Sequence, residues 1–246
     1  MGVTVMTAPR FRSWAVTHPG AKRSHNEDAY VDRPDLGLWA VADGAGGHAA
    51  GEVASGMIAE ALEAIPSDLS AAELLAEVRL AVERTHVALR EEAARRGPDV
   101  MVASTVVVMM ARGDHFACLW AGDSRAYLLR AGAMRQITRD HSLVQELLEA
   151  GAIGPDEVEN HPRANVITRA VGAELDEFAL DKVSDRLIAG DRFLLCSDGL
   201  CKTLREPELA GLLGSLDGTP SQALVDAALA ANVSDNVTAV TVEFTG

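Results

Sequence analysis

An apolar run ends in an acidic turn in the stretch LWAVADG, residues 38–44. The same pattern recurs in FLLCSDG, residues 193–199, while SDNVTAVTVEF, residues 234–244, carries its aspartate just before the apolar run. Short apolar runs that are rich in Val, Leu and aromatic residues and bounded by Gly or Asp are typical of buried strands. The sequence therefore predicts three buried strands, each with an aspartate at one end.

These three aspartates, Asp43, Asp198 and Asp235, need a charged partner, because a carboxylate beside a buried strand costs free energy unless its charge is compensated. Glu27 and Asp28 add two more carboxylates upstream. Oxygen ligands of this kind suit Mg²⁺ or Mn²⁺, whereas no pair of Cys or His residues has the spacing of a zinc site. Two such ions can lower the pKa of a shared water and hold it near phosphorus. We therefore expect a metal-dependent hydrolase.

The spacing of cysteines and arginines indicates which phosphate chemistry is possible. A cysteine-based phosphatase would carry an arginine six residues after its thiol, but the nearest candidate, Arg125, lies seven residues after Cys118. Arg23 lies four residues before Glu27. Its planar guanidinium matches phosphate oxygens in a bidentate way. Arg23 is therefore close enough to Glu27 to face the same site.

Length, charge and composition exclude several classes of protein. The chain has 246 residues, enough for a sizeable core, and a net charge of −14, which argues against nucleic acid as a partner because phosphate backbones bind basic surfaces. No signal peptide is visible, and the longest apolar stretch, residues 100–111, is too short to span a bilayer. Three cysteines without a regular framework fit a reducing compartment. We expect a soluble, cytoplasmic protein that contacts no membrane and forms a single domain over residues 1–246.

Strands and helices are expected to alternate in blocks. The runs expected to be strands are residues 40–42, 102–110, 115–120, 126–130, 192–196 and 237–244. A capping box at 70–73 opens a long helix that stops at 97–98, and the helix before it ends at Pro66. Further helices are predicted after residues 140–142 and from 219–222. The weakly periodic segment 151–166 is predicted to be an exposed loop or flap.

Six short motifs follow one another along the chain: RSHNED (23–28), ADGAGGH (42–48), AGDSR (121–125), DHS (140–142), SDGL (197–200) and SDNVT (234–238). Together they resemble the motifs of the metal-dependent protein phosphatases, the type 2C or PPM family. Each is weak alone, since Asp-Gly is a common turn, but they occur in the family's order and cover about residues 15–244. The Gly-Gly-His variant of the second motif and the compact length resemble bacterial members.

The resemblance implies an α+β fold. It is a four-layer α-β-β-α sandwich, in which two antiparallel sheets are flanked by helix pairs and the metal ions lie in a cleft at one edge of the sheets. We expect the protein to be a monomer.

By the same resemblance, the site holds two core ions, Mn²⁺ or Mg²⁺. Asp43 bridges them and the backbone carbonyl of Gly44 is a further ligand. Asp198 and Asp235 bind the first ion, and Glu27 helps to hold the second. The resemblance also implies that Arg23 binds the substrate phosphate, which makes Arg23 and Asp43 the catalytic residues.

Three further residues complete the expected site. Asp123, together with Asp198, matches a third and weaker metal site of bacterial members. Asp28 and Asn236 are expected to support the ligands from behind, as the neighbours of metal ligands usually do.

The implied activity is hydrolysis of phosphoserine and phosphothreonine in proteins, by direct attack of a water that bridges the two ions, without a phosphoenzyme. Phosphorylated proteins and a Ser/Thr kinase that the enzyme opposes are the implied partners. Animal members often carry a His two residues after the bridging Asp, where this chain has Ala45, and His48 follows three residues later; a metal-bound water is our preferred acid for the leaving group. Two alternatives stay open: a pseudophosphatase that binds phosphoproteins without turnover, and a two-metal phosphoesterase that acts on small phosphoesters.

Overall fold

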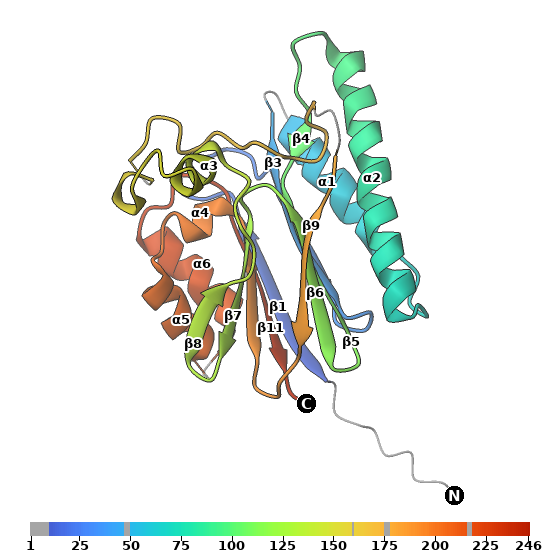
Figure 1. The fold of residues 1–246 in the computed structure, drawn as a ribbon, viewed down its shortest axis with the longest axis vertical. Coiled ribbons are helices and arrows are strands. Elements are labelled where there is room, and N and C mark those ends of the chain that lie inside the picture. Colours follow the sequence, from blue (N-terminus) through green and yellow to red (C-terminus); the bar gives the residue numbers. More distant parts are fainter. Residues whose placement is uncertain (1–9, 47–49, 159, 175–177, 216–217) are drawn as a thin grey trace, which may run out of the picture.

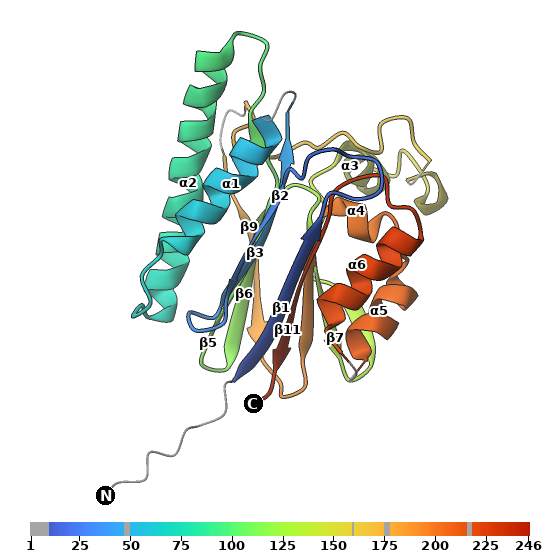
Figure 2. The same ribbon diagram turned by 180° about the vertical axis from the view of Figure 1, so that it is seen from behind.

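The computed structural model describes residues 10–46, 50–158, 160–174, 178–215 and 218–246. In these ranges two antiparallel sheets lie face to face, and helices cover the outer side of each sheet (Figures 1 and 2). This arrangement confirms the predicted α+β fold and its α-β-β-α layers.

The first sheet has the strand order β1-β11-β10-β7-β8. Its strands are β1 (Phe11–His18), β11 (Val237–Phe244), β10 (Arg192–Cys196), β7 (Arg125–Arg130) and β8 (Ala133–Gln136). The second sheet has the order β2-β3-β5-β6-β9, with the short strand β4 paired to β3. Its strands are β2 (Asp28–Arg33), β3 (Leu38–Ala45), β5 (Val106–Arg112), β6 (His115–Ala121), β9 (Asp181–Arg186) and β4 (Ala103–Ser104).

The helices form two pairs and a group at one end of the sheets (Figure 1). The second sheet is covered by α1 (Ala50–Glu63) and α2 (Ala71–Arg96), and the first by α5 (Glu206–Gly214) and α6 (Pro220–Ala230). At the end of the sheets lie α3 (Leu143–Glu149) and the single turn α4 (Asp198–Cys201). The predicted flap, residues 151–166, contains the 3₁₀ turn Pro155–Glu157 within its described part.

The core has three layers, one between the two sheets and one between each sheet and the helices that cover it, so that the central strands are buried on both faces. In β3, Leu38 and Ala40 pack with the residues of α1 and α2, whereas Trp39 belongs to the layer between the two sheets. In that layer Phe116 of β6 meets Phe193 of β10 edge to face, with ring centroids 4.8 Å apart. Because side chains alternate between the faces of a strand, a strand buried on both faces has a continuous apolar sequence. This is why β3, β10 and β11 were predictable.

The predicted helix boundaries are confirmed where capping residues define them. Ser70 Oγ accepts a hydrogen bond from the Glu73 backbone N–H at 3.3 Å, and Glu73 accepts one from the Ser70 N–H at 2.8 Å. At the start of α3, Ser142 Oγ accepts a hydrogen bond from the Gln145 backbone N–H. Pro220 occupies the first turn of α6, where its missing N–H costs no hydrogen bond.

The strand predictions need two corrections. The run predicted as one strand over residues 102–110 is divided into β4 and β5 at Thr105, whose N–H bonds the Asp43 carbonyl oxygen at 2.9 Å. The sequence analysis also missed β1, β2, β8 and β9. In β9, for example, partly buried and exposed residues alternate, so its sequence lacks an apolar run.

The topology brings the acidic ends of several strands to one edge, the upper edge in Figure 1. Antiparallel pairing of β10 with β11 places the end of β10, which precedes Asp198, beside the start of β11, which follows Asp235. In the other sheet, the start of β2 lies beside the end of β3, where Asp28 pairs with Asp43. The connection from β6 to β7 crosses between the sheets and carries Asp123.

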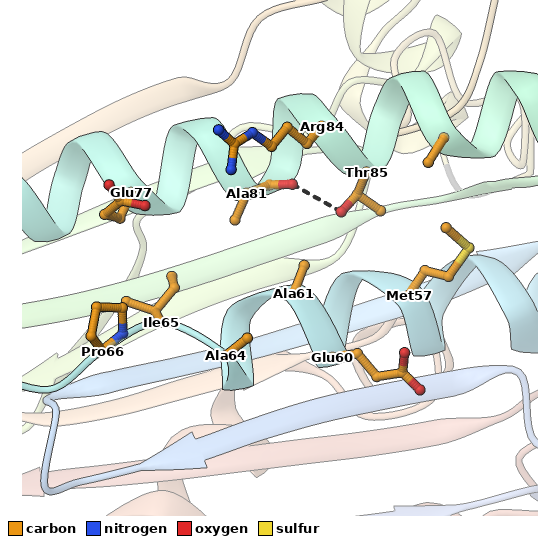
Figure 3. Close-up of a pocket in the computed structure, with 11 residues that line it drawn as sticks. Met57, Glu60, Ala61, Ala64, Ile65, Pro66, Glu77, Ala81, Arg84 and Thr85 are labelled. Carbon is orange, nitrogen blue, oxygen red and sulfur yellow. Dashed lines mark hydrogen bonds between the residues drawn. The ribbon is translucent and has the colours of Figure 1, made fainter.

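A groove of about 520 Å³ lies elsewhere, between α1 and α2 (Figure 3). Its lining is mainly small and apolar, with Ala61, Ala64 and Ile65 facing Ala81 and Thr85. None of the predicted site residues lines it. No described helix has the length and apolar composition needed to cross a bilayer.

Candidate metal centre

Asp43 lies at the centre of the acidic edge, where ionisation of its carboxyl is unfavourable. The protein atoms packed around it are the main cause that raises its pKa well above the ordinary value. The negative charges of four neighbours, Asp28, Asp198, Asp123 and Asp235, raise this pKa further. Like-charged carboxylates that gather in a desolvated place need a cation nearby if they are all to ionise. The structure thus brings together the aspartates that were predicted as ligands.

Asp28 links the two sheets behind this centre. Its Oδ2 accepts hydrogen bonds from Ser197 Oγ at 2.8 Å and from Thr238 Oγ1 at 2.6 Å. Burial above all raises the pKa of Asp28 to about 7, against the lowering effect of these two bonds. Its Oδ1 is buried and has no hydrogen-bond partner among the described residues. The sequence analysis missed Ser197 and Thr238, although both lie inside quoted motifs.

Asn236 fixes the backbone of the segment before β2, which carries Arg23 and Glu27. Its Oδ1 accepts a hydrogen bond from the Glu27 backbone N–H at 2.8 Å. Its Nδ2 donates to the carbonyl oxygens of His25 at 2.9 Å and Pro19 at 3.1 Å. These three bonds fix the backbone on both sides of Arg23, and the role of Asn236 in supporting metal ligands stays a prediction.

Gly44 lies where three backbone segments approach closely. Its N–H donates to the Glu27 carbonyl oxygen at 3.0 Å. A Cβ atom at this position would lie 2.1 Å from the Gly51 carbonyl oxygen and 2.6 Å from that of Glu27. A Cβ on Gly51 would in turn lie 2.8 Å from Glu27 Cδ. Two glycines therefore let α1 pack against the loop that carries Glu27, and only the first was predicted to matter.

Arg23 reaches the edge from the side of the first sheet. Its NH2 donates to Asp235 Oδ2 at 3.0 Å, and both side chains are about half exposed. The hydrogen bond and charge of Asp235 raise the pKa of Arg23 above its ordinary value. The structure thus places the predicted phosphate-binding residue next to a predicted ligand.

Lys202 is the residue of this region that the sequence analysis did not find. Its Nζ donates to Asp198 Oδ2 at 2.6 Å, to Asp123 Oδ2 at 3.3 Å and to Asn165 Oδ1 at 3.1 Å. Burial in the first place raises the pKa of Asp123 to about 6. The spacing of four residues between Asp198 and Lys202 was the available signal, since such a pair shares one face of a helical turn.

The motif at 140–142 supports the turn that carries Asp123. His141 Nδ1 accepts a hydrogen bond from the Gly122 N–H at 3.1 Å. Asp140 accepts a forked pair of bonds from Arg125, with NH2 to Oδ2 at 2.7 Å and Nε to Oδ1 at 3.0 Å. Arg125 is thus held in an ion pair next to Asp123. Two residues of the motif at 42–48, Gly47 and His48, lie outside the described residues.

The donor set fits hard divalent cations. Asp43, Asp198, Asp235 and Glu27 offer carboxylate oxygens, and Gly44 offers a backbone carbonyl, which are the donors that Mg²⁺ and Mn²⁺ prefer. The pKa values of Asp28, Asp43 and Asp123 are raised, and Asp28 and Asp123 each have a buried carboxylate oxygen without a partner in the part of the chain that the structure describes. Both observations fit a site whose negative charges need a cation. No group of three or more His, Cys, Asp or Glu side chains in the described ranges is already arranged to hold an ion, and two cationic side chains contact the carboxylates instead.

Known proteins match this chain over most of its length. A family model described as Protein phosphatase 2C matches residues 20–234. Serine/threonine protein phosphatase PstP of Mycobacterium tuberculosis is 37% identical over 223 residues, which are 90% of this chain and 42% of PstP. Serine/threonine phosphatase stp of Listeria innocua is 33% identical over 236 residues, 92% of this chain and 93% of the relative. This chain thus spans less than half the length of PstP and nearly all of stp.

Solved structures agree with the sequence matches. PppA, described as a key regulatory component of T6SS in Pseudomonas aeruginosa, superposes with a TM-score of 0.87 at 43% identity, covering 95% of this chain and 97% of PppA. The catalytic domain of PstP, solved in complex with 2 manganese ions, gives a TM-score of 0.86 at 33% identity, covering 96% and 99%. The chain belongs to the protein phosphatase 2C family.

Proposed function

We propose that this chain is a metal-dependent protein serine/threonine phosphatase. The observation that carries the proposal is the convergence of Asp43, Asp198 and Asp235 at one edge of two sheets, where burial first and then the neighbouring charges raise the pKa of Asp43. Every ligand position of the family's motifs holds an oxygen donor here, which favours turnover over a pseudophosphatase. Relatives named as serine/threonine phosphatases support the substrate class.

In this proposal, two Mn²⁺ or Mg²⁺ ions are held by Asp43, the Gly44 carbonyl, Glu27, Asp198 and Asp235. When bound, such ions supply a water of lowered pKa and neutralise charge on the phosphoryl oxygens. The relative solved with 2 manganese ions supports this number of core ions. Asp28 and Asn236 position the ligands through the hydrogen bonds described above.

Arg23 orients the phosphate of the substrate. A guanidinium carries five N–H donors in a planar fork, so its bond to Asp235 uses only part of its capacity. Its half-exposed position at the acidic edge leaves the side chain accessible to a phosphorylated side chain. Arg23 also offsets the repulsion between a dianionic phosphate and the surrounding carboxylates.

A water molecule, rather than a protein nucleophile, attacks phosphorus in this proposal. Burial raises the pKa of the Cys118 thiol, and a hydrogen bond with Cys201, followed by burial, raises that of Cys196 well above its ordinary value. Neither thiol is therefore available as the thiolate that covalent catalysis needs. The methyl side chain of Ala45 has no acidic proton to donate, so we assign protonation of the leaving group to a water at the site.

We also propose that the chain acts as a monomeric single domain in the cytoplasm, on phosphorylated proteins, and opposes a Ser/Thr kinase. The net charge of −14 supports protein rather than nucleic-acid substrates. The free cysteines Cys118, Cys196 and Cys201 fit a reducing compartment.

The test is hydrolysis of a phosphothreonine peptide with Mn²⁺, by the wild type and by Asp43→Asn. We expect turnover that needs the metal and that falls at least about 100-fold in the variant, as for the loss of one transition-state contact. Binding of the peptide without turnover would identify a pseudophosphatase. A kcat/KM that is much higher for nucleotides or sugar phosphates than for phosphopeptides would identify a small-molecule phosphoesterase.

A further inference from the structure

The ammonium group of Lys202 lies between two carboxylates that the family resemblance assigns to a third metal ion. It donates to Asp198 Oδ2 at 2.6 Å and to Asp123 Oδ2 at 3.3 Å. The side chain of Asp123 is 4% exposed, and that of Lys202 is 39% exposed. One cation of the protein itself thus serves both carboxylates.

The backbone fixes both sides of this contact. Lys202 closes the single turn α4, and its N–H donates to the Asp198 carbonyl oxygen at 2.8 Å, which directs its side chain along the same face as Asp198,. Asp123 follows Gly122, whose φ of +112° and whose close approach to Thr105 suit only glycine,. The two carboxylates and the lysine are therefore held by the local fold.

A third hydrogen bond uses the remaining N–H donor of Lys202. Its Nζ donates to Asn165 Oδ1 at 3.1 Å, in the predicted flap. An ammonium has three N–H donors, and here they meet three oxygens. Although burial lowers it, the charges of Asp198 and Asp123 raise the pKa of Lys202 above the ordinary value, which keeps the group charged.

We propose that Lys202 is a tethered cation that takes the place of a third metal ion between Asp123 and Asp198, so that the chain binds two divalent ions rather than three. A divalent ion between Asp123 and Asp198 would compete with Lys202 for these carboxylates and would be repelled by the adjacent ammonium. The inference rests on the two-ion site proposed above, but not on the substrate or on turnover.

The experiment is a count of bound Mn²⁺ per chain, by equilibrium dialysis and elemental analysis up to saturation, on three proteins. We expect two ions for the wild type, three for Lys202→Met and two for Lys182→Met, which removes the same charge from an exposed position of β9. Three ions in the wild type, or two in a folded Lys202→Met protein, would overturn the inference. Absence of Mn²⁺ from every protein would overturn the two-ion site as well, whereas two ions without phosphatase activity would contradict only the proposed function.

A second measurement needs no variant. The chain has three lysines, and Lys22 and Lys182 are exposed. Reductive methylation followed by peptide mass spectrometry reports the reactivity of each amine. At saturating Mn²⁺ we expect Lys202 to react at least tenfold more slowly than Lys182, because its three donors remain engaged. A rise of Lys202 reactivity to that of Lys182 when Mn²⁺ is added would show that a metal ion displaces it and would contradict the inference.

Discussion

Asp28 and Asp43 stand directly opposite each other on the neighbouring antiparallel strands β2 and β3. Like charges in opposed positions destabilise a sheet, and each of these carboxyls has a raised pKa. Asp28 also bonds residues of the other sheet through Ser197 and Thr238. Repulsion between these two carboxylates therefore destabilises the fold where the two sheets meet, and a bound cation would offset this repulsion.

The first prediction concerns pH. The pKa of Asp28 is raised to about 7 in the folded chain, above the value of about 3.9 for an unfolded aspartate. The folded state thus holds this proton more tightly than the unfolded state, so the protonated carboxyl of Asp28 contributes to the free energy of unfolding. This contribution is fully present below about pH 4 and is lost as pH rises through about 7. Without metal, we expect the wild type to lose thermal stability relative to Asp28→Asn across this range. The amide oxygen of Asn can still accept the bonds from Ser197 and Thr238.

Thermal unfolding at several pH values, with EDTA and then with Mn²⁺, measures this difference. Asp99→Asn, at an exposed position, serves as the control and should follow the wild type. We expect Mn²⁺ to reduce the pH dependence of the wild type. A difference between wild type and Asp28→Asn that does not change with pH would contradict the account.

The second prediction concerns close packing at Gly44. A Cβ there would lie 2.1 Å from the Gly51 carbonyl oxygen, which is backbone and cannot rotate away. We expect Gly44→Ala to lower the free energy of unfolding by at least about 2 kcal/mol, as other overpacking substitutions do. The matched control is Gly56→Ala in α1, where nothing lies within 4 Å. That change should stabilise by about 0.5–1 kcal/mol through helix propensity. Equal effects of the two substitutions in urea unfolding would refute the packing argument.

The third prediction concerns Asn236. Its side chain bonds the backbone of Glu27, His25 and Pro19, so we expect Asn236→Ala to weaken Mn²⁺ binding by roughly 10–100-fold, the usual cost of losing support behind a metal ligand. Calorimetric titration with Mn²⁺ measures the affinity. Gln222→Ala, on α6, provides a control with the same loss of an amide. Unchanged affinity in Asn236→Ala would mean that the loop carrying Glu27 is held by other contacts.

The fourth prediction concerns Arg23. Loss of a charge-assisted hydrogen bond costs about 1.5–3 kcal/mol, so Arg23→Ala should raise KM for a phosphothreonine peptide roughly 10–100-fold. Arg23→Lys should recover only part of this, because an ammonium lacks the planar fork. Arg205→Ala removes an exposed arginine that pairs with Glu208 and should leave the kinetics unchanged. A KM that is the same for Arg23→Ala and the wild type would exclude the phosphate-binding role.

The sequence predicted the parts of the fold whose signal is local. Strands β3, β10 and β11 are apolar throughout because both faces are buried, and the capping box at Ser70 marks the start of α2. Strand β9 was missed because its sequence, DKVSDR, has no apolar run. The division at Thr105 depends on its bond with Asp43, far away in the sequence.

In the candidate site, too, the residues with a local signal were predictable, and those that depend on contacts distant in sequence were not. The aspartates at strand ends were visible because each adjoins an apolar run. The contact of Asp28 with Ser197 and Thr238 joins residues 169 and 210 positions apart, and only the topology brings them together. The role of Gly51 depends on the path of a neighbouring loop and leaves no pattern in a single sequence. Lys202 leaves only its spacing of four residues from Asp198, which does not reveal the turn that presents Asp123.

Anomalous diffraction from a crystal grown with Mn²⁺ shows whether the acidic edge holds divalent ions. We expect two anomalous peaks at this edge, with Asp43 in contact with both ions, Asp198 and Asp235 with one, and Glu27 beside the other. A map without manganese at these carboxylates, in a crystal where the edge is open to solvent, would contradict the account.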